Sequence, residues 1–362
     1  MSGDFPPGLL LILGGLVVPF ISGRLRTVWM LGLPVLAFAL LWNLPDGNHQ
    51  TLEAFGVQLE LLRIDSLSRI FGYIFILASF LGGIYSLHLR SPLEPASALV
   101  YAGAAVGAVC AGDLISLFIF WELTALASVF LIWSSGTQSA FRAGMRYLII
   151  QVGSGVLLLA GLLVRWDATG SVAFDYIGLD SPGGYLILVA FGIKCAFPLL
   201  HNWLQDAYPE ATPTGTVVLS AFTTKLAVYA LARSYAGTDI LIWIGALMTA
   251  FPIFFAVIEN DLRRVLAYSL NNQLGFMVVG VGIGTELALN GTAAHAFTHI
   301  LYKALLFMSM GAVLHRVGTT LGTELGGLYK TMPWTTGFCI VGAASISAFP
   351  LFSGFVSKSM IL

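Results

Sequence analysis

Charge is scarce in this sequence. Only 10% of the 362 residues are Asp, Glu, Lys or Arg, whereas a soluble globular domain contains about 25%. Hydrophobic residues make up 57% of the chain, and no hydrophilic stretch is long enough to form a domain of its own. A soluble globular fold is therefore excluded. We expect an all-α polytopic protein that crosses a lipid bilayer many times.

Cysteine, surplus basic charge and cofactor motifs are scarce too. Cys110, Cys195 and Cys339 lie in apolar runs and are expected to be small buried side chains, not disulfides or metal ligands. The formal net charge of −1 gives no basis for nucleic-acid binding. Without a hydrophilic domain there is no evident place for a nucleotide, a flavin or an iron–sulfur cluster, so we expect no cofactor and no metal. No basic residue precedes Arg24, which predicts a retained first helix rather than a cleaved signal peptide.

The chain instead contains a series of apolar stretches near the length of about 20 residues that a transmembrane helix needs. The longest early connection contains FGVQLELLRID, whose weak alternation predicts a hairpin at the membrane surface. The expected spans, about twelve, are 7–22, 27–44, 67–89, 95–111, 114–134, 143–165, 183–204, 212–235, 240–258, 265–284, 292–315 and 334–362.

Basic residues in the short loops predict the orientation of the chain. With the N-terminus outside, nine Lys and Arg residues fall in cytoplasmic links and three on the opposite side, which favours this topology. The cytoplasmic set is Arg24, Arg26, Arg90, Arg142, Arg146, Arg263, Arg264, Arg316 and Lys330, and the opposite set is Arg63, Arg165 and Arg233.

One span carries three ionisable side chains on a single stripe. His295, His299 and Lys303 follow one another at intervals of four residues, which places them on one helical face. A charged side chain at the centre of a bilayer costs roughly 2.5–3.5 kcal/mol on insertion scales, so such residues usually serve a function. Two imidazoles and an amine in a row suggest a path for protons. The alternatives are a metal site, although the Glu of an H-E-x-x-H motif is absent, and histidines satisfied within a buried core.

Lysine and arginine are distributed differently. The arginines sit at or near the expected helix ends, whereas Lys194, Lys225, Lys303 and Lys358 fall within spans. A buried lysine can release its proton and an arginine cannot, so this pattern suits proton handling. The alternative, most plausible for Lys225 and Lys358, is that the amine reaches along the helix to an interface.

Glu122 is the acid that matches these amines. It lies near the middle of the fifth expected span, and Lys194 is its candidate partner in this half of the chain. A passing proton would break such a pair, although a static structural ion pair is the alternative. Asp113 opens the same span and is expected to cap the helix.

Two spans contain an interrupting proline. Pro198 follows Lys194, and Pro350 and Gly354 precede Lys358, so the seventh and twelfth helices should break or kink there. Broken helices that carry lysine are typical of transporters built from repeats, and ordinary proline kinks are the alternative. The polar residues beyond the first break either line a cytoplasmic entry path or are solvated at the interface: His201, Asp206 and Glu210.

Five segments, in order, resemble one known family. They read FWELTALAS, GIKCAFPLLHNWLQDAYPEA, DLRRVLAYSLNNQLGF, HAFTHILYKALLFMSMGAVLHR and SAFPLFSGFVSKSMIL. They resemble the antiporter-like subunits, the proton-channel subunits of respiratory complex I, membrane-bound hydrogenases and Mrp-type sodium/proton antiporters. The sequence as a whole is most similar to the D subunits of Mrp-type antiporters.

The resemblance implies two inverted repeats, each with one broken helix, and a hydrophilic axis at the membrane midplane. It implies N-terminal helices in 1–94, a first repeat in 95–238 and a second, incomplete repeat in 239–362. The chain ends four residues after Lys358, so either another polypeptide supplies the remainder of the second repeat or this is a shortened form. The residues that match the proton pathway of the family are Glu122, Lys194, Lys225, His295, His299, Lys303 and Lys358.

We therefore expect an ion-transport subunit, not an enzyme in its own right, in a bacterial inner membrane. It would move protons in exchange for a monovalent cation such as sodium, together with other membrane subunits. Three alternatives stay open: a proton-pumping subunit of a complex I-like or hydrogenase-type oxidoreductase, a component of a proton-coupled bicarbonate uptake complex, and a structural subunit that no longer conducts.

Overall fold

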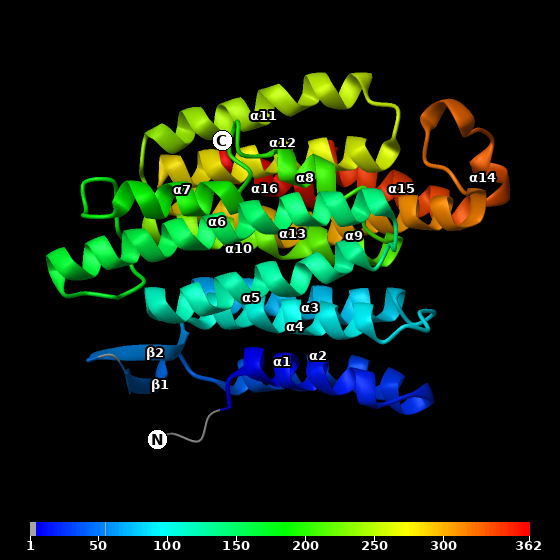
Figure 1. Ribbon diagram of the computed structural model, residues 1–362. Coiled ribbons are helices and arrows are strands. Elements are labelled where there is room, and N and C mark those ends of the chain that lie inside the picture. Colours follow the sequence, from blue (N-terminus) through cyan, green and yellow to red (C-terminus); the bar gives the residue numbers. More distant parts are fainter. Residues whose placement is uncertain (1–4, 55) are drawn as a thin grey trace.

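The structure is a computed structural model that describes residues 5–54 and 56–362 (Figure 1). Helices occupy all twelve expected spans in this described part, and four spans consist of two helical pieces each. The elements are α1 (Pro7–Val17), η1 (Val18–Phe20), α2 (Gly23–Asn43), β1 (Gly47–Ala54), β2 (Val57–Ile64), α3 (Ser66–Tyr85), α4 (Leu93–Cys110), α5 (Leu114–Trp133), α6 (Gln138–Thr169), α7 (Gly184–Lys194), α8 (Asn202–Ala207), α9 (Pro213–Ala221), α10 (Thr223–Ser234), α11 (Ile240–Ile258), α12 (Leu262–Ile283), α13 (Glu286–Val317), η2 (Gly322–Glu324), α14 (Leu328–Thr331), α15 (Pro333–Ile346) and α16 (Ser353–Ile361).

The helices lie along one common direction in stacked layers. In Figure 1, α1 and α2 form the lowest layer, α3 to α5 the next, and α11 the uppermost. Within the described residues, eight helices are long and apolar enough to cross a membrane. The antiparallel hairpin β1–β2 projects from one end of the helices, as its alternation predicted. The expectation of a polytopic all-α membrane protein is confirmed.

Both proline breaks are confirmed, and each helix stops rather than kinks. Helix α7 ends at Lys194 and α15 ends at Ile346, each four residues before its proline. A proline ring clashes with the carbonyl four residues before it, so the helix cannot continue beyond Lys194 or Ile346. The sequence Ala-Phe-Pro-Leu occurs at both breaks, and its Ala and Leu have positive φ in both copies, from 55° to 73°. L-residues rarely adopt this backbone, so surrounding contacts must hold both breaks in place.

A third break was not predicted. Helix α9 ends at Ala221 and α10 begins at Thr223, with Phe222 between them. The Thr223 N–H donates to the buried hydroxyl of Tyr101 at 2.9 Å instead of to the preceding turn. The segment contains neither proline nor glycine, so the sequence carries no local signal for this break.

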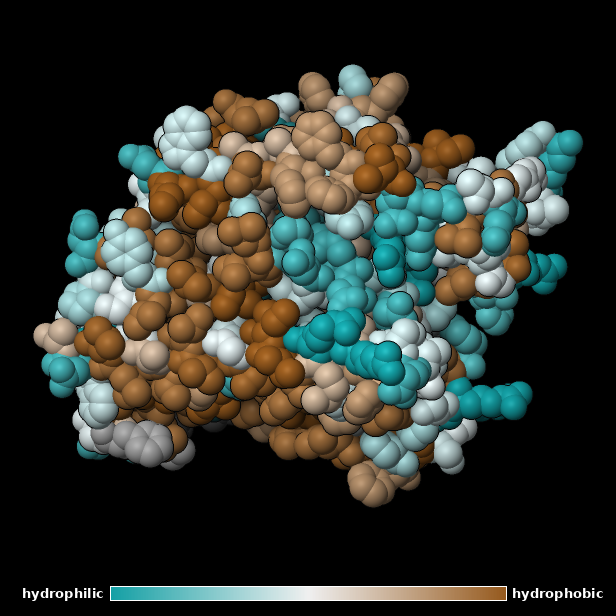
Figure 2. Space-filling view, turned by 45° about the horizontal axis from the view of Figure 1, so that its top comes forward, coloured by the Kyte–Doolittle hydropathy of each residue, from teal (hydrophilic) through white to brown (hydrophobic). Residues whose placement is uncertain are grey.

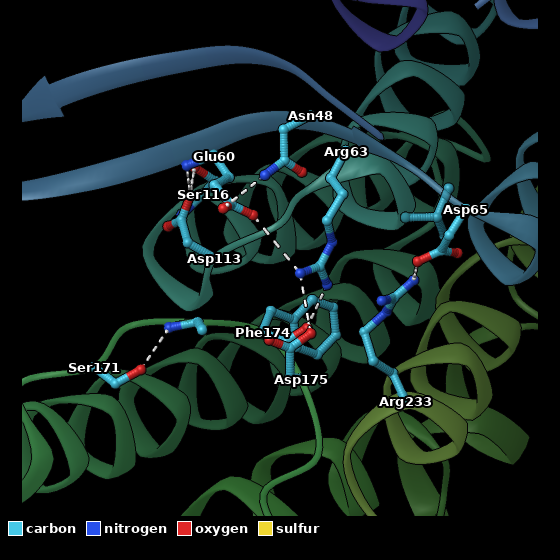
Figure 3. Close-up of polar contacts among 12 residues, drawn as sticks. Asn48, Glu60, Arg63, Asp65, Asp113, Ser116, Ser171, Phe174, Asp175 and Arg233 are labelled. Carbon is cyan, nitrogen blue, oxygen red and sulfur yellow. Dashed lines mark hydrogen bonds and ion pairs between the residues drawn. The ribbon is translucent and has the colours of Figure 1, made fainter. Parts of the chain in front are cut away.

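Helices α5–α6 and α12–α13 repeat one another in detail. Asp113 caps α5 and pairs with Ala173 beyond α6, whereas Asp261 caps α12 and pairs with Leu321 beyond α13. The two copies point in opposite directions. Asp113 lies at the hairpin end of the molecule, and Asp261 lies beside the turn that leads to α14 (Figures 1 and 3).

The second helix of each copy has the same length and the same ends. Helices α6 and α13 both have 32 residues. Each follows a threonine that caps it, Thr137 or Thr285, and each ends at a glycine with left-handed backbone, Gly170 or Gly318. Residues of α6 and α13 can therefore be matched position by position.

A polar network ties the hairpin end of the molecule together (Figure 3). Arg63 of β2 donates to Asp175 at 3.0 Å, and Arg233 of α10 donates to Asp65 at 2.6 Å. Asp65 also caps α3 by accepting from the Ser68 N–H. Burial alone would raise the pKa of the Asp65 carboxyl, but the Arg233 charge and the Ser68 amide outweigh it and hold that pKa below its usual value.

Replacing Asp65 tests this network. We expect Asp65→Ala to lower the free energy of unfolding by about 1–2 kcal/mol, since the cap and a partly screened ion pair are lost together. Because the pKa of Asp65 is lowered in the folded state, its contribution should be full above its unfolded pKa. The contribution should then vanish as the pH falls through the folded pKa.

The measurement is thermal unfolding in detergent at a series of pH values. Asp175→Ala is the control, because Asp175 is 60% exposed and caps nothing, and it should cost less than about 0.5 kcal/mol. Equal losses in the two variants, or an Asp65→Ala deficit that persists in acid, would contradict the assignment.

Candidate functional site

Three of the four lysines within the spans are completely buried. Lys194, Lys225 and Lys303 are each 0% exposed, and Lys358 is partly buried. The alternative that Lys225 reaches an interface is therefore wrong, because its amine lies inside the protein. A buried ammonium group needs hydrogen-bond acceptors, and each of these four amines has one.

Lys194 and Glu122 lie near each other but do not form the expected direct pair. The Lys194 Nζ donates to the Trp121 carbonyl at 2.5 Å and to Thr124 Oγ1 at 2.7 Å. In the described part of the chain, Glu122 Oε1 has no hydrogen-bond partner and no ion pair joins it to Lys194. The two charges still act on one another. The amine is satisfied by neutral oxygens of Trp121 and Thr124, on either side of Glu122 in α5, so the Glu122 carboxylate is not its hydrogen-bond partner.

Lys225 occupies the unpredicted break between α9 and α10. Its Nζ donates to the Ser220 carbonyl at 2.6 Å. That carbonyl lies at the end of α9, where the helix has stopped and the carbonyl lacks its usual partner in the next turn. Irregular backbone of this kind is tolerated within a membrane where protein surrounds it or where it lines a cavity.

The stripe on α13 faces the interior over its whole length. His295, His299 and Lys303 are each 0% exposed. The His295 Nδ1 lies 2.8 Å from Ser357 Oγ of α16, and the ring centroids of the two histidines are 6.1 Å apart. Lys303 donates to the hydroxyl of Ser269 on α12. Across the described residues, neither nitrogen of His299 has a hydrogen-bond partner.

Lys358 closes the row on the second broken helix. Its Nζ donates to the Ile346 carbonyl at 2.8 Å, at the point where α15 ends, and lies 4.8 Å from the centroid of the Phe276 ring. Gly354 permits this arrangement, because a Cβ at that position would overlap the Ser345 carbonyl. The amine thus caps the helix that the proline interrupts.

The seven residues that the sequence singled out differ in burial. Five are fully buried, namely Lys194, Lys225, His295, His299 and Lys303. Glu122 and Lys358 are partly buried.

Two of the three expected entry residues line a hollow, and the third does not. His201 and Asp206 line a hollow of about 620 Å³ together with Arg146, Gln205 and Arg264. Arg146 pairs with Asp206 at 2.6 Å. Glu210 lies outside the hollow and accepts from Ser139 Oγ at 2.6 Å. In Figure 2 hydrophilic side chains reach from the right-hand end, where Figure 1 places α14, towards the middle of an otherwise hydrophobic face.

Several partners of the buried amines were missed. Thr124 and Ser357 hold Lys194 and His295, yet small hydroxyl residues in apolar runs give no signal of their own. Glu94 was missed as well. It is 6% exposed at the start of α4 and accepts from the hydroxyls of Thr212 and Thr214.

The tight contact at Gly354 gives a direct test of the geometry around Lys358. Gly354→Ala should push α16 away from α15 and lower the free energy of unfolding by about 1–3 kcal/mol, because a methyl group would meet backbone. Gly337→Ala is the control on α15, since no described atom lies within 4 Å of its added Cβ, and it should be neutral or stabilising by up to about 1 kcal/mol. Thermal unfolding of the purified variants is the measurement, and a Gly354→Ala protein as stable as the control would contradict the contact.

Comparison with known proteins identifies the family to which the chain is similar. Residues 111–362 match the transmembrane family described as NADH:quinone oxidoreductase/Mrp antiporter. The chain is 32% identical to the D subunit of the Na(+)/H(+) antiporter of Alkalihalophilus pseudofirmus, over 71% of this chain and 56% of that protein. It is 34% identical to the N subunit of the NADH-quinone oxidoreductase of Desulforudis audaxviator, over 79% of this chain and 63% of that protein.

The fold agrees with this result. A chain of the Mrp complex from Dietzia sp. DQ12-45-1b aligns with a TM-score of 0.86 at 24% identity, over 100% of this chain and 74% of that one. The chain spans about half the length of the curated relatives it matches. On the family match over residues 111–362, this chain belongs to the transmembrane family of NADH:quinone oxidoreductase and Mrp antiporter subunits.

Proposed function

We propose that this chain is the proton-translocating membrane subunit of a multi-subunit antiporter that exchanges protons for a monovalent cation, with sodium as that cation. The observation that carries the proposal is the buried row of amines and imidazoles, in which Lys194, Lys225 and Lys303 are held by neutral oxygens. A buried ammonium group without a carboxylate bonded to it is costly, so its proton can leave when a neighbouring charge changes. The similarity to the D subunit of an Na(+)/H(+) antiporter supports the choice of exchange reaction.

The proposed route follows the row. Protons enter from the cytoplasmic side through the hollow lined by His201 and Asp206 and reach Lys225. They pass to Lys303, His299 and His295 on α13 and leave by Lys358. A change of charge on Glu122 or Lys194 gates the route electrostatically, because these two groups act on each other without being locked in a direct pair.

The repeat boundaries and the orientation complete the proposal. The N-terminal helices occupy 1–94, the first repeat 95–238 and the second repeat 239–362, in agreement with the paired caps of α5 and α12. The N-terminus faces outwards in a bacterial inner membrane. Arg26 and Arg90 of the expected cytoplasmic set bond to each other, and Arg63 and Arg233 of the opposite set both bond within the hairpin end, which supports this orientation.

A second candidate function is a proton-pumping subunit of an oxidoreductase whose partner chains do the redox chemistry. The similarity to the N subunit of an NADH-quinone oxidoreductase and to hydrogenase-4 component B favours it. Purification in mild detergent, followed by identification of the co-purifying chains, separates the two. Chains that bind iron–sulfur clusters or nickel would support the oxidoreductase, and small membrane subunits alone would support the antiporter.

Substitution of the gating pair tests the proposal. In proteoliposomes that contain the assembled complex, Glu122→Ala and Lys194→Ala should each slow proton-coupled cation flux by roughly 100-fold, the scale of losing one positioned proton-transfer group. Lys330→Ala is the control, because Lys330 is exposed on α14 and should transport at the rate of the unmodified protein. Unchanged flux in Glu122→Ala and Lys194→Ala complexes that still assemble would rule the mechanism out.

A further inference from the structure

Helix α6 carries a stripe that corresponds to the histidine stripe of α13. The two helices have the same length, the same threonine cap and the same terminal glycine. When they are aligned on these ends, Tyr147 matches His295, Gln151 matches His299 and Gly155 matches Lys303. All three positions of the α6 stripe are buried.

The first position of each stripe bonds a hydroxyl group. The Tyr147 hydroxyl lies 2.7 Å from Ser128 Oγ of α5. On α13 the matching His295 bonds Ser357, the residue before Lys358. The partner of Tyr147 thus lies on the helix of Glu122, and the partner of His295 lies on the helix of Lys358.

The second position of each stripe is polar and without a protein partner. Gln151 is 0% exposed, and in the described part of the structure neither its nitrogen nor its oxygen has a hydrogen-bond partner. The matching His299 has the same environment. Buried polar groups are nearly always hydrogen-bonded, to ordered water where protein provides no partner. Gln151 is therefore placed to hold water one helical turn from Tyr147 and one turn from Gly155.

At the third position the two halves differ in which helix supplies the ionisable group. Lys303 projects from α13 itself, whereas Gly155 leaves space on α6 that the Glu122 carboxylate of α5 fills. A Cβ at Gly155 would overlap that carboxylate. The stripe of the first half therefore also ends at a charged group, which is Glu122.

We propose that Tyr147 and Gln151 form a proton relay in the first half of the chain, between the Tyr147–Ser128 hydroxyl pair and the Glu122–Lys194 site. Hydroxyl groups and water both donate and accept hydrogen bonds, so each oxygen in the series gains one proton and releases another. The amide of Gln151 orders the water and does not itself ionise. The relay rests on the proposed function, and it adds two residues of α6 that lead to the Glu122–Lys194 site.

Transport by conservative variants tests the relay. Tyr147→Phe keeps the ring, which lies 5.5 Å from the ring of Trp203, and removes only the hydroxyl. Gln151→Leu keeps the volume and removes the amide. Each should slow proton-coupled flux by about tenfold, the rate equivalent of one lost hydrogen bond. Gln151→His, which copies the second half, should conduct.

Tyr208→Phe is the matched control. Its buried hydroxyl donates to the Leu219 carbonyl at 2.9 Å, and a carbonyl cannot pass a proton on. It should transport at the unmodified rate. Normal flux in Tyr147→Phe and Gln151→Leu, or an equal loss in Tyr208→Phe, would overturn the relay. Lys194→Ala in the same assay separates failure of the relay from failure of the proposed function. Slow flux in Lys194→Ala would leave the proposed function standing even if the relay failed. Normal flux in Lys194→Ala would contradict both the relay and the proposed function.

Water access at Gln151 can be tested without any transport assay. In a Cys339→Ser background, a Gln151→Cys thiol should react with a small water-soluble methanethiosulfonate reagent, as mapped by mass spectrometry. The native Cys110 thiol is 2% exposed and serves as the unreactive internal control. A Gln151→Cys thiol as unreactive as Cys110 would overturn the relay whatever the transport rates.

Discussion

The interior of a bilayer offers no water to satisfy polar groups, and the rest of this structure depends on how the chain meets that constraint. Three of the four buried amines donate to backbone carbonyls. The acceptors of Lys225 and Lys358 are carbonyls at the ends of α9 and α15, where the helices have stopped. Each break therefore does two things at once. It frees an acceptor that the helix would otherwise use, and it provides a position where a cation can lie at membrane depth.

The same constraint explains why the Glu122–Lys194 site is looser than an ion pair. The Lys194 amine is satisfied by the Trp121 carbonyl and the Thr124 hydroxyl, so the nearby carboxylate is not needed to hold it. A carboxylate bonded to the amine would hold the proton in place and make the pair structural. Separation of the two charges leaves each able to respond to the other, as the proposed gating by this site requires.

Much of the fold could be predicted from the sequence, because its signals are local. Apolar length gave the twelve spans, and the prolines gave two of the breaks at the correct residues. The break at Phe222 has no proline or glycine and depends on the distant Tyr101 hydroxyl, which no local pattern reveals. The ionisable members of the site were predictable because charge is rare in such a chain. Their neutral partners, such as Ser357 and Thr124, were not, because a hydroxyl becomes significant only through what the fold brings to it.

The central claim is that the buried row of amines, imidazoles and amides is hydrated and continuous. A cryo-EM map of the assembled complex, at a resolution that shows ordered water, tests it most directly. The account predicts water density beside His299 and Gln151 and along the free edge of Glu122, where the described protein atoms provide no partner. Side chains packed closely around these groups, with no density between Lys225 and Lys303, would contradict it.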